Sequence, residues 1–198
     1  MYLLEKADKA YASRRGTVHA LRDVSLEIPQ GSCVTITGRS GSGKTTLLLT
    51  LGGLIRPTSG RVLFHGLDLG GLSDAKLARY RNQKIGFVLQ TFNLVPYLSA
   101  LENIMVPMMF MNGSNDGLDG RARDLLGRLG LGDRADHLPR ELSVGQQQRV
   151  AIARALGNDP EVILADEPTG NLDPRLATEV LDTLRELNEK DGRTVIMV

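Results

Sequence analysis

A chain of 198 residues is long enough for one well-buried core but too short for two full domains. Its net charge of +1, its 4% aromatic content and its lack of Trp do not support a nucleic-acid surface, so no nucleic-acid partner is expected. The single cysteine, Cys33, cannot close an internal disulfide, and the apolar run around it predicts a buried strand residue rather than a reactive thiol.

The first half of the chain alternates between strand-like and helix-like segments. An apolar run predicts a buried strand over Ser32–Thr37, followed by a Gly/Ser loop and a helix over Lys44–Leu51. Two further strands, Arg61–Phe64 and Ile85–Leu89, flank a predicted helix over Ser73–Arg81. This alternation predicts an α/β fold with a mainly parallel sheet.

Between Gln90 and about Arg140 the pattern becomes helical. Predicted helices at Ala100–Met111 and Arg121–Leu129 flank a polar segment, Asn112–Gly120, that is typical of an exposed loop tip. This block predicts a helical insertion rather than a continuation of the sheet.

The alternation of strands and helices returns after the insertion. The remaining predicted elements are a helix at about Gly145–Leu156, a strand at Val162–Ala165, a helix at about Pro174–Lys190 and a last strand at Thr194–Val198. Because the last strand stands at the chain terminus, it is expected to be only marginally held.

The residues from Gly38 to Thr45 match the phosphate-loop pattern G-x-x-x-x-G-K-[ST] at every position, between a predicted strand and a predicted helix. In such a loop the lysine, Lys44, bridges the β- and γ-phosphates and the hydroxyl of Thr45 binds Mg²⁺. The residues predicted to bind ATP are Gly38, Arg39, Ser40, Gly41, Ser42, Gly43, Lys44, Thr45 and Thr46. An ordinary Gly/Ser turn would not need the complete spacing. A dinucleotide loop would need glycine where Thr46 stands.

The predicted strand Val162–Ala165 ends in two carboxylates. Asp166 is placed to hold Mg²⁺, and Glu167 is placed to act as the general base on the attacking water. Alone this signal is weak, since strand ends often carry acids into solvent. Together with an upstream phosphate loop it favours hydrolysis of a nucleoside triphosphate.

The segment between these motifs narrows the class of protein. Leu142–Gln146 resembles the LSGGQ signature of ABC ATPases, and Gln146–Leu156 continues that family's pattern. Asn171–Asp173 is similar to the family's D-loop, and Gln90 looks like its Q-loop glutamine, which would contact Mg²⁺ or the attacking water. Tyr11 looks like the aromatic residue that stacks on adenine, although a packing role is an equally good interpretation.

The resemblance covers essentially the whole chain and implies one ABC ATPase domain over residues 1–198. It implies a P-loop NTPase core with an N-terminal antiparallel β subdomain, formed by residues 1–90 and 158–198. It also implies an inserted helical subdomain over about residues 91–157.

The resemblance further implies a homodimer that ATP promotes. In it, Ser143, Gly145 and Gln146 of one chain would face the ATP held by the phosphate loop of the other. A serine that merely caps an ordinary helix would have the same local geometry.

Two departures from the family pattern stand out. Val144 replaces the first of the two adjacent glycines of the signature, which removes backbone freedom there. The family also has a switch histidine just beyond its last strand, and the sequence stops within Thr194–Val198. The C-terminal end therefore looks truncated, and this form is expected to hydrolyse ATP weakly.

Three stretches, Arg81–Val88, Leu98–Ile104 and Asp166–Asp173, resemble the branch that contains lipoprotein-release, macrolide-export and FtsE ATPases. The favoured function is therefore the motor subunit of an exporter or envelope complex, cytoplasmic and peripheral on the membrane through a permease partner. A soluble ABC ATPase acting on ribosomes or DNA is the alternative. A non-ABC P-loop kinase or GTPase is the third possibility, which the signature and D-loop disfavour.

A surface for the permease is predicted around Phe92–Met111. This segment combines Phe92 and Tyr97 with several methionines, whose unbranched side chains adapt to varied contacts. Packing within the helical insertion is the competing interpretation, and Pro107 interrupts any regular helical stripe. The resemblance favours docking, because the segment follows Gln90.

Overall fold

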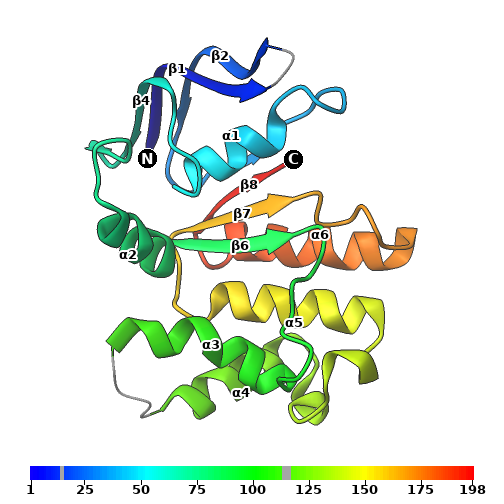
Figure 1. Ribbon diagram of the computed structural model, residues 1–198. Helices are drawn as coiled ribbons and strands as arrows, with labels where there is room; N and C mark the ends of the chain where they lie inside the picture. The colour runs from blue at the N-terminus through cyan, green and yellow to red at the C-terminus, as the bar shows by residue number, and fades with distance from the viewer. Residues whose placement is uncertain (14–15, 113–116) are drawn as a thin grey trace.

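The computed structural model describes residues 1–13, 16–112 and 117–198 (Figure 1). The strands are β1 (Tyr2–Ser13), β2 (Gly16–Ile28), β3 (Cys33–Thr35), β4 (Ser59–Phe64), β5 (Leu67–Asp68), β6 (Ile85–Leu89), β7 (Val162–Asp166) and β8 (Thr194–Met197). The helices are α1 (Lys44–Leu51), α2 (Asp74–Lys84), α3 (Ala100–Asn112), α4 (Leu118–Arg128), α5 (Val144–Leu156) and α6 (Pro174–Glu189), with short 3₁₀ turns at Gly132–Arg134 and Pro139–Glu141.

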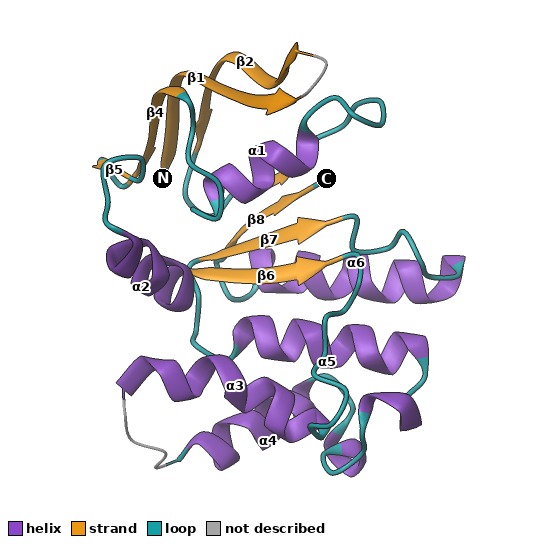
Figure 2. Ribbon diagram, in the orientation of Figure 1, coloured by secondary structure: helices purple, strands orange, loops and turns teal. Residues whose placement is uncertain are grey.

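The strands form two four-stranded sheets. One is antiparallel with the order β2-β1-β4-β5, and the other is parallel with the order β3-β8-β7-β6. Figure 2 shows the antiparallel sheet above α1 and the parallel sheet below it. The predicted α/β fold, with a mainly parallel sheet and an N-terminal antiparallel β subdomain, is confirmed.

The inner strands of the parallel sheet, β7 and β8, are covered on both faces, and their side chains divide between two hydrophobic cores. On β7, Val162 and Leu164 pack into the core shared with α1 and the antiparallel sheet. Their neighbours Ile163 and Ala165 pack into the core shared with α3, α5 and α6. Because successive side chains of a strand point to opposite faces, a continuous apolar run is needed here.

A buried pair of tyrosines ties the antiparallel sheet to the helices beneath it. The hydroxyl oxygens of Tyr2 on β1 and Tyr80 on α2 lie 2.6 Å apart, and both hydroxyls donate to the carbonyl oxygen of Leu51 at the end of α1. Burial raises the pKa of both phenols above the ordinary range. Three distant parts of the chain therefore meet at one carbonyl group.

The helices α3, α4 and α5 lie together on the side of the parallel sheet away from α1 (Figure 1). Their contact surface contains buried residues from all three, including Ile104, Leu126 and Ile152. The insertion is thus helical, and its limits at about residues 91 and 157 stay a prediction. The predicted loop Asn112–Gly120 lies partly outside the described residues, and α4 already begins at Leu118.

The elements predicted from the sequence agree closely with the structure. α1 and β6 have the predicted bounds, and the other α-helices begin and end within three residues of theirs. The sequence does not delimit the long strands β1 and β2, because their polar, irregularly paired residues show no clean alternation of apolar and polar positions.

Two expectations about strands were wrong. Cys33 is exposed, since β3 is an edge strand that pairs only with β8 and has one face uncovered by described residues. The terminal strand β8 is not marginal: it lies between β3 and β7, and Thr194, Val195 and Ile196 are fully buried. No helix of the described residues is long and apolar enough to span a bilayer.

Candidate functional site

The phosphate loop lies between β3 and α1 and curls around its own lysine. The Lys44 ammonium group donates hydrogen bonds to the carbonyl oxygens of Gly38 at 2.9 Å and Arg39 at 3.1 Å. α1 begins at Lys44, so its unpaired N–H groups open toward the loop. The loop thus gathers a cation and a helix N-terminus at one point, which suits a phosphate group.

The glycine at position 43 is required by a close approach of β2. Gly43 has φ = 93°, and a Cβ atom there would lie 2.1 Å from the carbonyl oxygen of Ala20. Only glycine can adopt this φ readily and leave that space open. β2 therefore forms one wall of a groove of about 370 Å³ beside the loop, where His19 and Arg22 lie alongside Lys44.

Thr45 and Asp166 bring two side-chain oxygen atoms together. The Thr45 hydroxyl donates to Oδ1 of Asp166 at 3.0 Å, although the residues stand 121 positions apart. Hard oxygen donors of this kind fit Mg²⁺, which keeps several waters and takes phosphate oxygens into its octahedral shell. Two protein oxygens cannot fill that shell, so a Mg²⁺ ion held here would need nucleotide and water to complete it.

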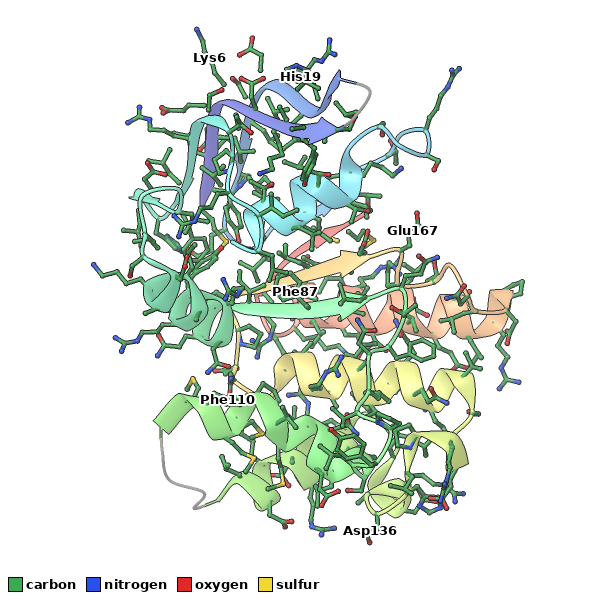
Figure 3. The ribbon with its side chains drawn as sticks, in the orientation of Figure 1. Lys6, His19, Phe87, Phe110, Asp136 and Glu167 are labelled. Carbon is green, nitrogen blue, oxygen red and sulfur yellow. The ribbon has the colours of Figure 1, made fainter. Side chains whose placement is uncertain are left out.

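The side chains of Glu167 and Gln90 both lie close to Gly170. A Cβ atom on Gly170 would lie 3.1 Å from Nε2 of Gln90 and 3.5 Å from Oε2 of Glu167. The Asn171 amide also donates to the backbone carbonyl oxygen of Gln90 at 3.3 Å. Glu167 is exposed, at the end of β7 (Figure 3), so its carboxylate is open to water. The two predicted catalytic side chains are thus brought together.

The signature segment forms the N-terminus of α5. Ser143 accepts a hydrogen bond from the backbone of Gln146 at 3.3 Å, and the Gln146 side chain accepts one from the backbone of Ser143 at 2.9 Å. This is a capping box. Ser143 and Val144 are exposed, while Gly145 is buried against Leu176 of α6.

The structure also bears on the substitution at Val144. Helix α5 begins at Val144, so the residue needs only helical backbone angles, which valine adopts. At Gly145, in contrast, an added Cβ would lie 2.7 Å from Cδ2 of Leu176. Of the two positions, 145 is therefore the one at which an added side chain would displace a packed neighbour, the side chain of Leu176.

Tyr11 lies on β1 with 41% of its surface exposed. The ammonium group of Lys9 lies 5.1 Å from the centre of its ring. An exposed aromatic face with a cation beside it can accept a base or a partner side chain. Stacking on adenine stays a prediction.

The predicted site residues fall into two groups in space. Lys44, Thr45 and Asp166 lie at the carboxyl ends of the parallel strands, with Glu167 and Gln90 beside them. The signature end of α5 lies beyond the sheet from α1 and the phosphate loop, in the helical layer (Figure 1). One chain therefore does not bring its own signature to its own phosphate loop.

Sequence reasoning missed two side chains of α5 that hold the catalytic segments. Gln148 is fully buried and donates to the carbonyl oxygen of Pro168, the residue after Glu167, at 2.8 Å. Arg154 donates to the carbonyl oxygens of Phe92 and Asn93, shortly after Gln90. These contacts cannot be predicted from a local sequence pattern, because each joins residues at least 20 positions apart.

Comparison with known proteins matches the family model described as "ABC transporter" to residues 21–170. The lipoprotein-releasing system ATP-binding protein LolD of Geobacter metallireducens is 47% identical, over 99% of this chain and 88% of that protein. The macrolide export ATP-binding/permease protein MacB of Syntrophobacter fumaroxidans is 50% identical, over 100% of this chain but 28% of that longer protein.

A solved structure has a similar fold over the whole chain. It is the dimeric ATP-binding cassette MJ0796 of Methanocaldococcus jannaschii, in a post-hydrolysis state bound to ADP and Pi. It superimposes with a TM-score of 0.92 at 44% identity, covering 100% of this chain and 87% of that one.

Proposed function

The chain belongs to the ABC transporter family, as an ATP-binding domain that drives a membrane transporter, and from this premise we propose that it is the motor of an exporter or envelope complex. Its named relatives act in lipoprotein release and macrolide export, which supports this branch over an ABC ATPase acting on ribosomes or DNA. We place it at the inner face of the membrane, held there by a permease subunit.

The observation that carries the proposal is the meeting of three distant segments at the phosphate loop. Lys44 is held at the centre of the loop, Thr45 and Asp166 form an oxygen pair at 3.0 Å, and Glu167 lies near Gln90. When bound, Mg²⁺ would neutralise the phosphate charge. Lys44 would orient the β- and γ-phosphates, Gln90 would position the attacking water, and Glu167 would take its proton.

The separation of signature and phosphate loop within one chain supports an ATP-dependent homodimer. Ser143, the N-cap of α5, is exposed, and this end of the helix lies in the helical layer, beyond the parallel sheet from the phosphate loop (Figure 1). In a second copy this end of α5 could approach the γ-phosphate, because the dipole of a helix N-terminus favours an anion. Two ATP molecules would then join two chains, and hydrolysis would release them.

Two variants test the site. Lys44→Ala should abolish tight ATP binding in calorimetry, whereas Glu167→Gln should bind ATP normally and lose turnover by about 10²–10⁴-fold. ATP should also drive the Glu167→Gln variant into dimers on size exclusion, since the nucleotide persists. Full-rate hydrolysis by Glu167→Gln would remove Glu167 from the mechanism.

A groove between α2 and α3 supports docking of the permease. It measures about 780 Å³ and is lined by Leu54, Phe87, Leu89, Val106, Phe110 and Met111, among others. Phe110 is 79% exposed and Leu54 is 51% exposed, which is unusual for large apolar side chains. Phe110 lies at the far end of α3 from the catalytic edge (Figure 3). Helix α2 would thus share the surface predicted at Phe92–Met111.

The individual residues of Phe92–Met111 differ in their availability. Tyr97 is 78% exposed and Phe92 is half-buried, whereas Met108 is buried in the core at 3%. Substituting Tyr97 and Phe110 with serine should weaken co-purification with the permease without changing basal ATP hydrolysis. Leu67→Ser is the control, since Leu67 is 50% exposed on a different face. Equal recovery of the permease by both variants would place docking elsewhere.

A further inference from the structure

One arginine of the signature helix holds the segment that follows Gln90. Arg154 lies in the last turn of α5, and its two terminal nitrogens donate to the carbonyl oxygens of Phe92 at 2.7 Å and Asn93 at 2.6 Å. Phe92 and Asn93 stand two and three positions after Gln90. The planar fork of the guanidinium group binds both oxygens at once, which fixes the segment in orientation as well as distance.

The environment of Arg154 makes these two carbonyl groups its main partners. The side chain is half-buried, and among the described residues no carboxylate lies within ion-pair distance of it. Burial lowers the pKa of its guanidinium group from the ordinary value, although an arginine stays charged at neutral pH. A partly buried cation without a carboxylate needs strong acceptors, so the contact with this segment is specific rather than incidental.

The backbone of the clamped segment is itself held in an uncommon conformation. Asn93 has φ = 48°, in the left-handed region, which asparagine adopts more readily than most residues other than glycine. Such a conformation persists where surrounding contacts hold it, and the Arg154 hydrogen bond to the Asn93 carbonyl oxygen is one of these.

Helix α5 connects this clamp to the rest of the site. Its 13 residues, Val144–Leu156, follow the N-cap Ser143 and include Arg154 in the last turn. Between these two, Gln148 donates to the carbonyl oxygen of Pro168, the residue after Glu167. A helix of this length is a rigid rod of about 20 Å. A displacement of the Ser143 end by another group would therefore be transmitted to both the Gln90 segment and the Glu167 segment.

We propose that Arg154 is a positioning residue for ATP hydrolysis, which sets the place of Gln90 by binding the Phe92 and Asn93 carbonyl oxygens to the signature helix. The inference rests on the proposed ATPase function. It adds a mechanical link within one chain, from the N-terminus of α5 to the segment that carries Gln90.

The test compares Arg154→Met with Arg121→Met. Arg121 is a matched control, because it donates to the carbonyl oxygen of Gly157 at 2.7 Å, just after α5, without touching the Gln90 segment. Arg154→Met should lower kcat by about 10- to 100-fold, since a displaced catalytic group loses that much, while the Kd for ATP stays unchanged. Arg121→Met should keep kcat near that of the parent chain.

Arg154→Lys tests whether the planar fork of the guanidinium group, rather than its positive charge alone, holds the segment. An ammonium group keeps the cation but cannot bind both carbonyl oxygens in one plane, so kcat should be intermediate. If Arg154→Met fails to fold, the lysine variant decides. A lysine variant with the parent's melting temperature and the parent's kcat would overturn the proposal.

A fluorescent reporter gives a readout besides activity. The chain has no Trp, so Phe92→Trp places a single indole on the clamped segment. Adding Arg154→Met should increase quenching of this indole by acrylamide, whereas adding Arg121→Met should not. Unchanged quenching together with unchanged kcat would overturn the proposal. Absence of hydrolysis by the parent chain, in contrast, would contradict the proposed function itself.

Discussion

The contact between β2 and the phosphate loop can be tested by two alanine substitutions in that loop. Gly43 has φ = 93°, and its Cβ position lies 2.1 Å from the Ala20 carbonyl oxygen. Gly41 has a similar backbone, φ = 76°, but nothing lies within 4 Å of its Cβ position. The two variants therefore share the conformational cost and differ in the steric one.

The structure sets the size of each effect. A left-handed conformation costs a residue with a side chain about 1–2 kcal/mol, and this applies to both variants. Gly43→Ala adds a clash with backbone atoms of a paired strand, and overpacking of this kind costs about 1–3 kcal/mol more. At about 2–4 °C per kcal/mol for a chain of this size, Gly43→Ala should melt roughly 2–12 °C below Gly41→Ala.

Thermal unfolding without nucleotide, followed by circular dichroism, measures the difference between the two variants. Calorimetry with ATP then shows whether the displaced loop still binds phosphate, and Gly43→Ala should bind more weakly than Gly41→Ala. Equal melting temperatures for the two variants would mean that β2 does not pack against the phosphate loop as it does in the structure. Equal ATP affinities with unequal melting temperatures would separate the packing role of Gly43 from binding.

Three further predictions concern other parts of the chain. Thr45→Val should weaken Mg²⁺-dependent ATP binding by about tenfold, the equivalent of a lost hydrogen bond to a charged group, while Thr45→Ser retains it in calorimetry. Ile196→Ala should lower the free energy of unfolding by about 2–5 kcal/mol, as for a buried core residue; a loss as small as that of an exposed residue would contradict the central place of β8. Lys84 holds the pKa of Glu161 below its usual 4.5, so this pair should stabilise the fold above that pH and lose its effect as acid protonates the folded carboxylate. Urea unfolding of Glu161→Gln should therefore show a flatter dependence on acid pH than the parent.

The sequence predicted those parts of the site that are continuous in the chain. The phosphate loop from Gly38 to Thr45 and the pair Asp166–Glu167 each form from neighbouring residues, so spacing alone reveals them. Helix bounds were also predictable, because capping residues such as Asp173 and a proline at the first helical position, Pro174, act locally.

The strands of the antiparallel sheet were not predictable in detail for a physical reason. β1 and β2 pair with register shifts after Leu4 and around Lys9, and most side chains of β2 are exposed. Bulges break the two-residue period on which strand recognition depends. The resemblance to a family, and not the periodicity, indicated that an antiparallel sheet was present.

By itself, the sequence determined the chemistry: which residues could hold phosphate, which could ligate a hard cation and which could take a proton. The tertiary structure decided how these parts are held. It places the terminal strand β8 in the middle of the sheet, exposes Cys33 on an edge, and joins Arg154 to Phe92 across 62 positions. Such contacts depend on which strand pairs with which and on how helices cross the sheet, and those choices follow from the packing of the whole chain. These long-range contacts therefore cannot be predicted from any short stretch of residues.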